Sequence, residues 1–155
     1  AIFEKNGSTA SPWATIDLTM PQPSVVQISP YTSSAIYLGV SPDGAVVTAN
    51  DVAMTLHLFD AKTGAAIPTM LDGFADHVVD PAFSPDATLL AFSGNVSGYY
   101  PVEFYRSDLD VVDYDAATTS FSNLRTLVPL FSSAICFPSF SPDSKSLRSI
   151  VIAPG

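Results

Sequence analysis

The chain has 155 residues, of which 47% are hydrophobic and 14% are charged, and this composition excludes an intrinsically disordered chain. Fifteen acidic residues against six basic ones give a net charge of −9, which repels a phosphate backbone and excludes nucleic acid as the expected partner. The length suits one domain, and no apolar run reaches the roughly 20 residues of a membrane-spanning helix.

The chain begins with a stretch that is expected to carry only outer strands. Residues 1–12 are interpreted as an entry loop, and residues 13–30 as two outer strands of a sheet. Within them, residues 14–20 alternate apolar and polar side chains, which is typical of a half-buried strand. Two prolines interrupt the pattern before a second short strand over residues 24–29. The inner strands of this sheet are missing from the sequence.

One turn motif, Ser-Pro-Asp, then occurs three times along the chain, at residues 41–43, 84–86 and 141–143. Pro presets φ for a tight turn, Asp can bond back to the backbone, and the Gly of the first copy tolerates a positive φ. Apolar runs flank every copy, so each copy predicts a β-hairpin, and the near-continuity of the runs predicts sheets buried on both faces. The residues interpreted as structural turn residues are Pro42, Asp43 and Gly44, then Pro85 and Asp86, then Pro142 and Asp143.

The spacing of the copies indicates a repeat of four-stranded units. Ser41 and Ser84 are 43 residues apart, close to the ~40–45 residues of a propeller blade. The end of each unit also repeats, as Leu56–Gly64 and Val111–Thr119. The predicted units are one blade over residues 35–70, a second over 78–130 with an inserted loop at 94–108, and the two inner strands of a third over 135–152.

The repeat unit resembles the TolB-like, WD-like β-propeller repeats of bacterial proteins in the order of its features. These are an apolar strand, the F-S-P-D turn, a second apolar strand and then an aromatic-Asp-Ala sequence. The resemblance implies an all-β fold of four-stranded antiparallel blades, about two whole and two half blades in this chain. Three blades fall below the usual four to eight, so a partial propeller is expected, completed by a longer chain or by self-association. The resemblance also implies a bacterial periplasmic, cell-surface or secreted protein.

The inserted loop 94–108 is the strongest functional lead, because long loops in compact domains often carry function. Aromatic and Arg side chains, which are enriched at recognition hot spots, gather in it. The predicted ligand- or partner-binding residues are Tyr99, Tyr100, Phe104, Tyr105 and Arg106. The alternative is that these aromatic side chains fold back onto the blade edge and serve packing alone.

Catalytic motifs are missing from the sequence. It contains no nucleophile elbow and no glycine-rich phosphate loop, and neither His57 nor His77 lies in a ligand cluster. No catalytic residue, metal or cofactor is therefore predicted, and Cys136, in an apolar run, is interpreted as a small buried hydrophobe. The acidic residues between 108 and 115 are interpreted as a solvated outer strand.

Three functions remain open. The first is a non-catalytic binding or scaffold propeller that engages a protein, peptide or glycan through one rim of loops. The second, implied by resemblance to prolyl-oligopeptidase-like enzymes, is an accessory propeller of a hydrolase or peptidase whose catalytic domain is not in this chain. The third is a structural assembly element that pairs through open blade edges. Fold alone does not decide among them.

Overall fold

The structure, a computed structural model, describes residues 2–4, 13–16, 25–27, 38–50, 54–68, 71, 77–99, 103–129 and 134–152. Strands account for most of these residues, and every strand pairing is antiparallel. Among the described residues no helix is long and apolar enough to cross a membrane. The predicted all-β class is therefore confirmed.

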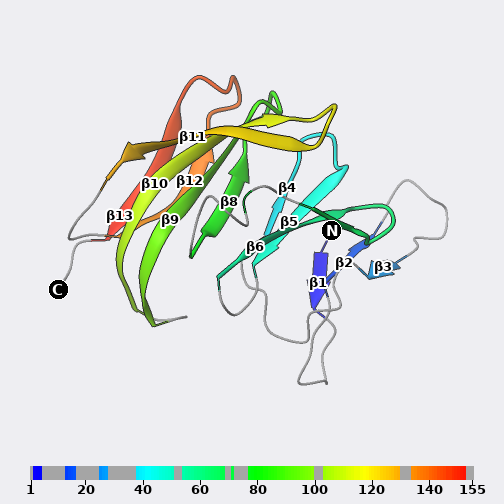
Figure 1. The fold of residues 1–155 in the computed structure, drawn as a ribbon, viewed down its shortest axis with the longest axis horizontal. Coiled ribbons are helices and arrows are strands. Elements are labelled where there is room, and N and C mark those ends of the chain that lie inside the picture. Colours follow the sequence, from blue (N-terminus) through cyan, green and yellow to red (C-terminus); the bar gives the residue numbers. More distant parts are fainter. Residues whose placement is uncertain are drawn as a thin grey trace.

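The strands form four sheets that follow one another in chain order across the molecule (Figure 1). The first sheet holds β1 (Ile2–Glu4), β2 (Trp13–Ile16) and β3 (Val25–Gln27). The second holds β4 (Leu38–Val40), β5 (Val46–Asn50), β6 (Leu56–Asp60) and β7 (Ala66–Ile67). The third holds β8 (Val79–Phe83), β9 (Leu89–Tyr99), β10 (Glu103–Asp115) and β11 (Ser120–Val128), and the fourth β12 (Ala134–Phe140) and β13 (Leu147–Ile152).

The three Ser-Pro-Asp turns share one hydrogen-bond pattern. In each, the Ser hydroxyl donates to the Asp carboxylate two residues later, at 2.6, 2.6 and 2.5 Å for Ser41, Ser84 and Ser141. The same hydroxyl accepts a backbone N–H from the first residues of the following strand, as from Val46 and Leu89. Side chain and backbone thus close each hairpin locally, which is why a short motif can specify it.

The residue after each turn Asp has a positive φ, whether or not it is glycine. Gly44 has φ 71°, Ala87 56° and Ser144 58°. Only the first copy has glycine at this position, yet the hydrogen bonds of the turn hold Ala87 and Ser144 in the same conformation. A positive φ has a steric cost for these two residues because they carry a Cβ atom. The turns of neighbouring sheets also touch, because the Ser144 hydroxyl accepts the N–H of Asp86 at 3.0 Å.

Both faces of the central strands are buried, as the near-continuous apolar runs predict. Every residue of β5 is buried, and so are Leu90, Ala91, Phe92 and Ser93 of β9. The main hydrophobic core lies between the second and third sheets, where Val46 and Leu58 pack with Leu90, Phe92 and Val112. A continuous apolar strand is therefore stable here because both of its faces are removed from water.

Two expected loops are strands. Residues 2–4, expected within the entry loop 1–12, form β1, which pairs with β2 from Ile2↔Thr15 to Glu4↔Trp13. A strand of three residues is too short to show a periodic pattern in the sequence. Residues 2–4 form a strand because they pair with β2. The second case is the insert at 94–108, most of which continues β9 and β10 as a hairpin.

Candidate functional site

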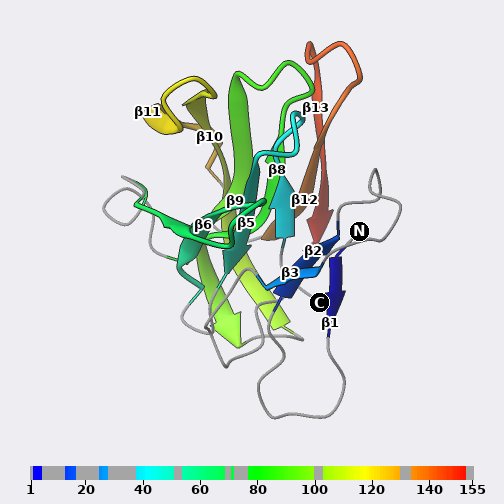
Figure 2. The ribbon, with the colours of Figure 1, turned by 90° about the vertical axis from the view of Figure 1, so that its right-hand side faces the viewer.

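The insert forms a β-hairpin that extends beyond its blade, and we call residues 94–99 and 103–108 the hairpin arm. Strand β9 has 11 residues and β10 has 13, against five each in β5 and β6 of the preceding blade. At ~3.3 Å per residue, the six extra residues of β9 extend roughly 20 Å. Figure 2 shows the arm leaving the sheets at the end opposite to the Ser-Pro-Asp turns.

Two contacts anchor the base of the arm to the starts of the inner strands. The N–H of Val96 donates to the carbonyl of His77 at 3.2 Å, just before β8. On the other strand, the buried Ser107 hydroxyl donates to the carbonyl of Ile135 and accepts its N–H, both at 2.7 Å. The arm is therefore held to segments that enter two successive blades, and its base is fixed.

Apart from the buried Ser107, the described polar side chains of the arm are exposed or half-buried. Arg106 and Ser97 are opposite each other in the hairpin and both are exposed. The exposed Asn95 donates from Nδ2 to Asp108 Oδ2 at 2.7 Å across the two strands. This pair stabilises the arm where it leaves the blade, next to the exposed side chains of Ser97 and Arg106.

The predicted binding residues lie on this arm as far as the structure describes them. Tyr99 ends β9 and pairs with Glu103, and Phe104 and Tyr105 follow in β10. Tyr100 and the side chains of Tyr99, Phe104 and Tyr105 lie outside the described residues. The backbone thus brings Tyr99, Phe104, Tyr105 and Arg106 to one hairpin, whereas His77 meets it through the backbone contact at its base.

A buried carboxylate lies under the arm. Asp110 is 3% exposed and lies opposite Phe92, and a Cβ added to Gly94 would come 1.9 Å from Asp110 Oδ2. Burial raises the pKa of Asp110, the hydrogen bond with Thr126 opposes this, and the Asp108 charge adds to the rise. The expectation that all acids of residues 108–115 are solvated is therefore wrong for Asp110, because glycine makes room for its side chain inside the blade.

Asp113 and Asp115 of that strand are half-buried and exposed, but β10 lies between β9 and β11 and is not the expected outer strand of its sheet. Asp113 forms an exposed ion pair with Arg125 at 2.7 Å and accepts a hydrogen bond from Asn123. Asp115 accepts the N–H of Ala117 and the hydroxyl of Thr118, so it shapes the turn into β11. These groups stabilise local structure and do not converge on a ligand site.

A second buried carboxylate, Asp80, lies on the inner strand β8. Its Oδ2 accepts the N–H of Phe137 on β12 at 3.0 Å, and the residue is 7% exposed. Burial raises its pKa, which the hydrogen bond from Phe137 only partly offsets. Burial and then the Asp80 charge raise the pKa of the Cys136 thiol to about 11. Cys136 is buried and free, so it packs as a small hydrophobe and its thiol stays protonated at neutral pH.

Four buried side-chain oxygens have no hydrogen-bond partner among the described residues, and all lie where the blades meet the arm. They are Oδ1 of Asn50, Asp80 and Asp110 and Oγ of Ser93. Asn50 ends β5, and Ser93 pairs with Val79 beside Asp80. These groups were not among the predicted site residues, although an Asp inside the apolar run 78–83 is a visible signal in the sequence. They make this end of the blades more polar than the core between the sheets.

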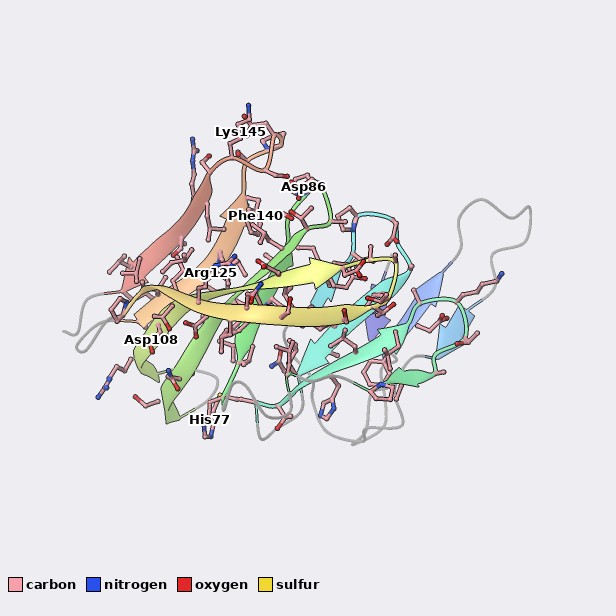
Figure 3. The ribbon with its side chains drawn as sticks, turned by 45° about the horizontal axis from the view of Figure 1, so that its top comes forward. His77, Asp86, Asp108, Arg125, Phe140 and Lys145 are labelled. Atoms are coloured by element: carbon pink, nitrogen blue, oxygen red, sulfur yellow. The ribbon has the colours of Figure 1, made fainter. Side chains whose placement is uncertain are left out.

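The opposite end of the molecule carries structural carboxylates. Hydrogen bonds from Ser41, Ser84 and Ser141 are the largest cause that lowers the pKa of Asp43, Asp86 and Asp143. In Figure 3, Asp86 and Lys145 mark this end and His77 the opposite one. Within the described part of the chain, no group of His, Cys, Asp and Glu could hold a metal ion.

Comparison with solved structures shows which fold these blades belong to. Tricorn protease matches 97% of this chain with a TM-score of 0.62 and 14% identity. TolB from Acinetobacter baumannii matches 94% of the chain with a TM-score of 0.58 and 17% identity. A putative TolB from Agrobacterium tumefaciens matches 80% of it with a TM-score of 0.51 and 25% identity. The chain thus has a TolB-like β-propeller fold.

The match covers only part of those longer proteins. This chain spans 14% of the tricorn protease chain, 33% of the Acinetobacter TolB chain and 39% of the Agrobacterium one. With two four-stranded blades flanked by smaller sheets, the described residues form a partial propeller. No protein-family model and no characterised protein sequence matches the chain.

Proposed function

We propose that this chain is a non-catalytic binding propeller that engages a protein or peptide partner through the hairpin arm. One observation carries the proposal: β9 and β10 continue past the blade as an ordered hairpin whose base is fixed by Ser107 and Val96. The blades then serve as the rigid support on which a recognition element is presented.

The chemistry of the arm fits a protein partner better than a small substrate. Three tyrosines, a phenylalanine and an arginine occur within residues 99–106, and such side chains contribute most at protein interfaces. The carboxylates with a perturbed pKa do not compete with this function, because Asp80 and Asp110 are buried and the turn Asp residues are engaged in their hairpins. A glycan is a further ligand that aromatic side chains of this kind bind.

The cellular setting belongs to the same proposal. The fold shared with two TolB structures supports a bacterial periplasmic, cell-surface or secreted protein. The net charge of −9 favours partners with basic surfaces through long-range attraction.

Peptide selection tests the proposal without knowledge of the natural partner. Peptides selected from a displayed random library on the immobilised chain are measured by fluorescence anisotropy against two variants. In the first, Tyr99, Tyr100 and Tyr105 are replaced by Ala; in the control, the exposed Lys62 and Lys145 are replaced by Ala. We expect affinity to fall at least about tenfold in the first variant and to be unchanged in the control. Equal affinity for all three proteins contradicts the proposal.

A second function, the accessory propeller of a hydrolase, is supported by the shared fold with a segment of tricorn protease. The denatured mass of the source polypeptide distinguishes the two. A mass well above 16.4 kDa, with a nucleophile elbow in the added sequence, favours the accessory function.

A further inference from the structure

Two carboxylates of β10, those of Asp108 and Asp110, converge at the foot of the hairpin arm. Side chains two residues apart on a strand share one face, and here Asp108 lies opposite Gly94 and Asp110 opposite Phe92. A Cβ added to Gly94 would collide with Oδ2 of Asp110. The Asp110 side chain therefore reaches toward the residue that faces Asp108, and the Asp108 charge adds to the rise in the pKa of Asp110.

The carboxylate of Asp110 has one oxygen that is buried and without a partner. Asp110 is 3% exposed, and its Oδ1 accepts no hydrogen bond from the described residues. The hydrogen bond with Thr126 of β11 holds the carboxylate in place but leaves this oxygen unpaired. Burial of such an oxygen is unfavourable unless a proton or a cation compensates it.

The arm supplies a third oxygen beside this pair. Asn95 follows Gly94 with a positive φ of 50°, and its Nδ2 donates to Asp108 Oδ2 at 2.7 Å. A half-turn of the amide exchanges Nδ2 for Oδ1, which converts this donor into a cation ligand. Asn95 is exposed and Asp108 half-buried, so water can reach the same point from solvent.

A divalent cation compensates this arrangement better than a proton does. A proton on Asp110 neutralises one carboxylate and leaves the charge of Asp108 beside it. A doubly charged ion between the two neutralises both and accepts the unpaired oxygen as a ligand. Carboxylate, amide and water oxygens are also the ligands that hard cations prefer.

We propose that Asp108, Asp110 and the amide of Asn95 form a site for a divalent hard cation, with Ca²⁺ preferred over Mg²⁺. Ca²⁺ accepts six to eight oxygens in irregular geometry, whereas Mg²⁺ requires a near-ideal octahedron. This site is irregular, because the register of β10 shifts between Arg106 and Asp108. Larger groups of His, Cys, Asp and Glu that could hold a metal do not occur among the described residues, so the amide and water complete the ligand set.

The bound ion would join three parts of the molecule. Asn95 belongs to β9, Asp108 to β10 where the arm leaves the blade, and Asp110 to the blade interior. The ion would therefore fix the two strands of the arm to the blade. The site contains none of the aromatic residues proposed to bind a partner, so it goes beyond that function and either proposal can fail without the other.

Isothermal titration calorimetry of the chelator-treated full chain with CaCl₂ tests the site. Asp110→Asn keeps the size of the side chain and removes one charge. Asp113→Asn is the matched control, because it makes the same change on the same strand at a carboxylate that pairs with Arg125. Asn95→Ala alters an exposed residue and keeps the test decisive if Asp110→Asn does not fold.

We expect one ion to bind the parent chain and Asp113→Asn with a Kd of about 10⁻⁴–10⁻³ M. Affinity should fall at least about tenfold in Asp110→Asn and at least about threefold in Asn95→Ala. Ca²⁺ should also raise the urea midpoint of the parent chain and of Asp113→Asn, but not that of Asp110→Asn.

Two results would overturn the proposal. The first is the lack of saturable binding to the parent chain up to about 10 mM Ca²⁺, which would leave a proton as the group that compensates Asp110. The second is an equal loss of affinity in Asp110→Asn and Asp113→Asn. It would show that the net charge of −9 attracts the ion without a defined site.

Discussion

The carboxylate of Asp80 accepts a hydrogen bond of 3.0 Å from the backbone N–H of Phe137, and the two residues have nearly the same positive φ, 54° and 55°. Each lies four residues before the Ser of its turn motif, so they occupy one position in successive repeats. Both strands also shift register there, between Val79 and Ala82 and between Cys136 and Ser139. The bulge repeats from blade to blade, and the Asp80 side chain joins one bulge to the next.

Asp80→Asn should change how stability depends on pH. Burial raises the pKa of Asp80 above its usual value of 3.8, so the carboxyl group holds its proton more tightly in the folded chain than in the unfolded chain. The stability it contributes is complete below pH 3.8 and is lost as the pH rises through the raised pKa. Asn cannot ionise, so the free energy of unfolding of Asp80→Asn relative to the parent should rise with pH. Urea unfolding of both proteins from about pH 4 to pH 8 measures the difference. A constant difference would contradict this prediction.

Ala87→Gly should stabilise the chain. Ala87 has φ 56° in the second turn, where Gly44 takes φ 71° in the first. Glycine removes the steric cost of that conformation, and part of the gain is offset by its freedom in the unfolded chain. We expect the free energy of unfolding to rise by about 0.5–1 kcal/mol. Gly44→Ala is the matched control and should lower it by a similar amount. A loss of stability with Ala87→Gly, or a gain with Gly44→Ala, would disprove a shared turn conformation.

Gly94→Ala should destabilise the base of the arm. The added Cβ would come 1.9 Å from Asp110 Oδ2, and the buried carboxylate has little room to move. We expect a loss of about 1–3 kcal/mol in the free energy of unfolding. Asp110→Ala removes the clashing atom, so the double variant should lose less than the sum of the single variants in a double-mutant cycle. Additive losses would show that the two side chains do not meet.

Ser107→Ala should loosen the arm from β12. The variant removes both hydrogen bonds between Ser107 and Ile135, and the buried N–H and carbonyl of Ile135 lose this partner. Losing one such partner costs about 1–3 kcal/mol. Amide hydrogen exchange should speed up in residues 103–108 and 134–136, while β5 keeps its protection. Unchanged exchange in residues 103–108 would mean that Ser107 does not anchor the arm.

Local chemistry made the blades predictable from sequence. Ser, Pro and Asp close each hairpin through bonds within six residues, so the motif alone locates the turns and the strands beside them. The apolar runs that became β5 and β9 were readable for the same reason. The spacing of the copies then implied the repeat.

Contacts between residues far apart in the chain could not be predicted from the sequence in this way. Asp80 meets Phe137 and Ser107 meets Ile135 across 57 and 28 residues, and no local pattern signals such a pairing. The arm was expected as a loop because it is an insert between two strands of the repeat, yet cross-strand pairing extends it as a hairpin. Burial of Asp110 likewise depends on the missing side chain of Gly94 on the neighbouring strand.

Site-specific photo-crosslinking tests most directly whether the arm is the recognition element. A benzophenone amino acid replaces Ser97, exposed on the arm, in one protein, and Lys145, exposed at the opposite end, in another. Each is irradiated in an extract of the source organism. The account predicts a discrete adduct from position 97, competed by excess parent protein, and none from position 145. Adducts from position 145 alone, or none from either position, would contradict it.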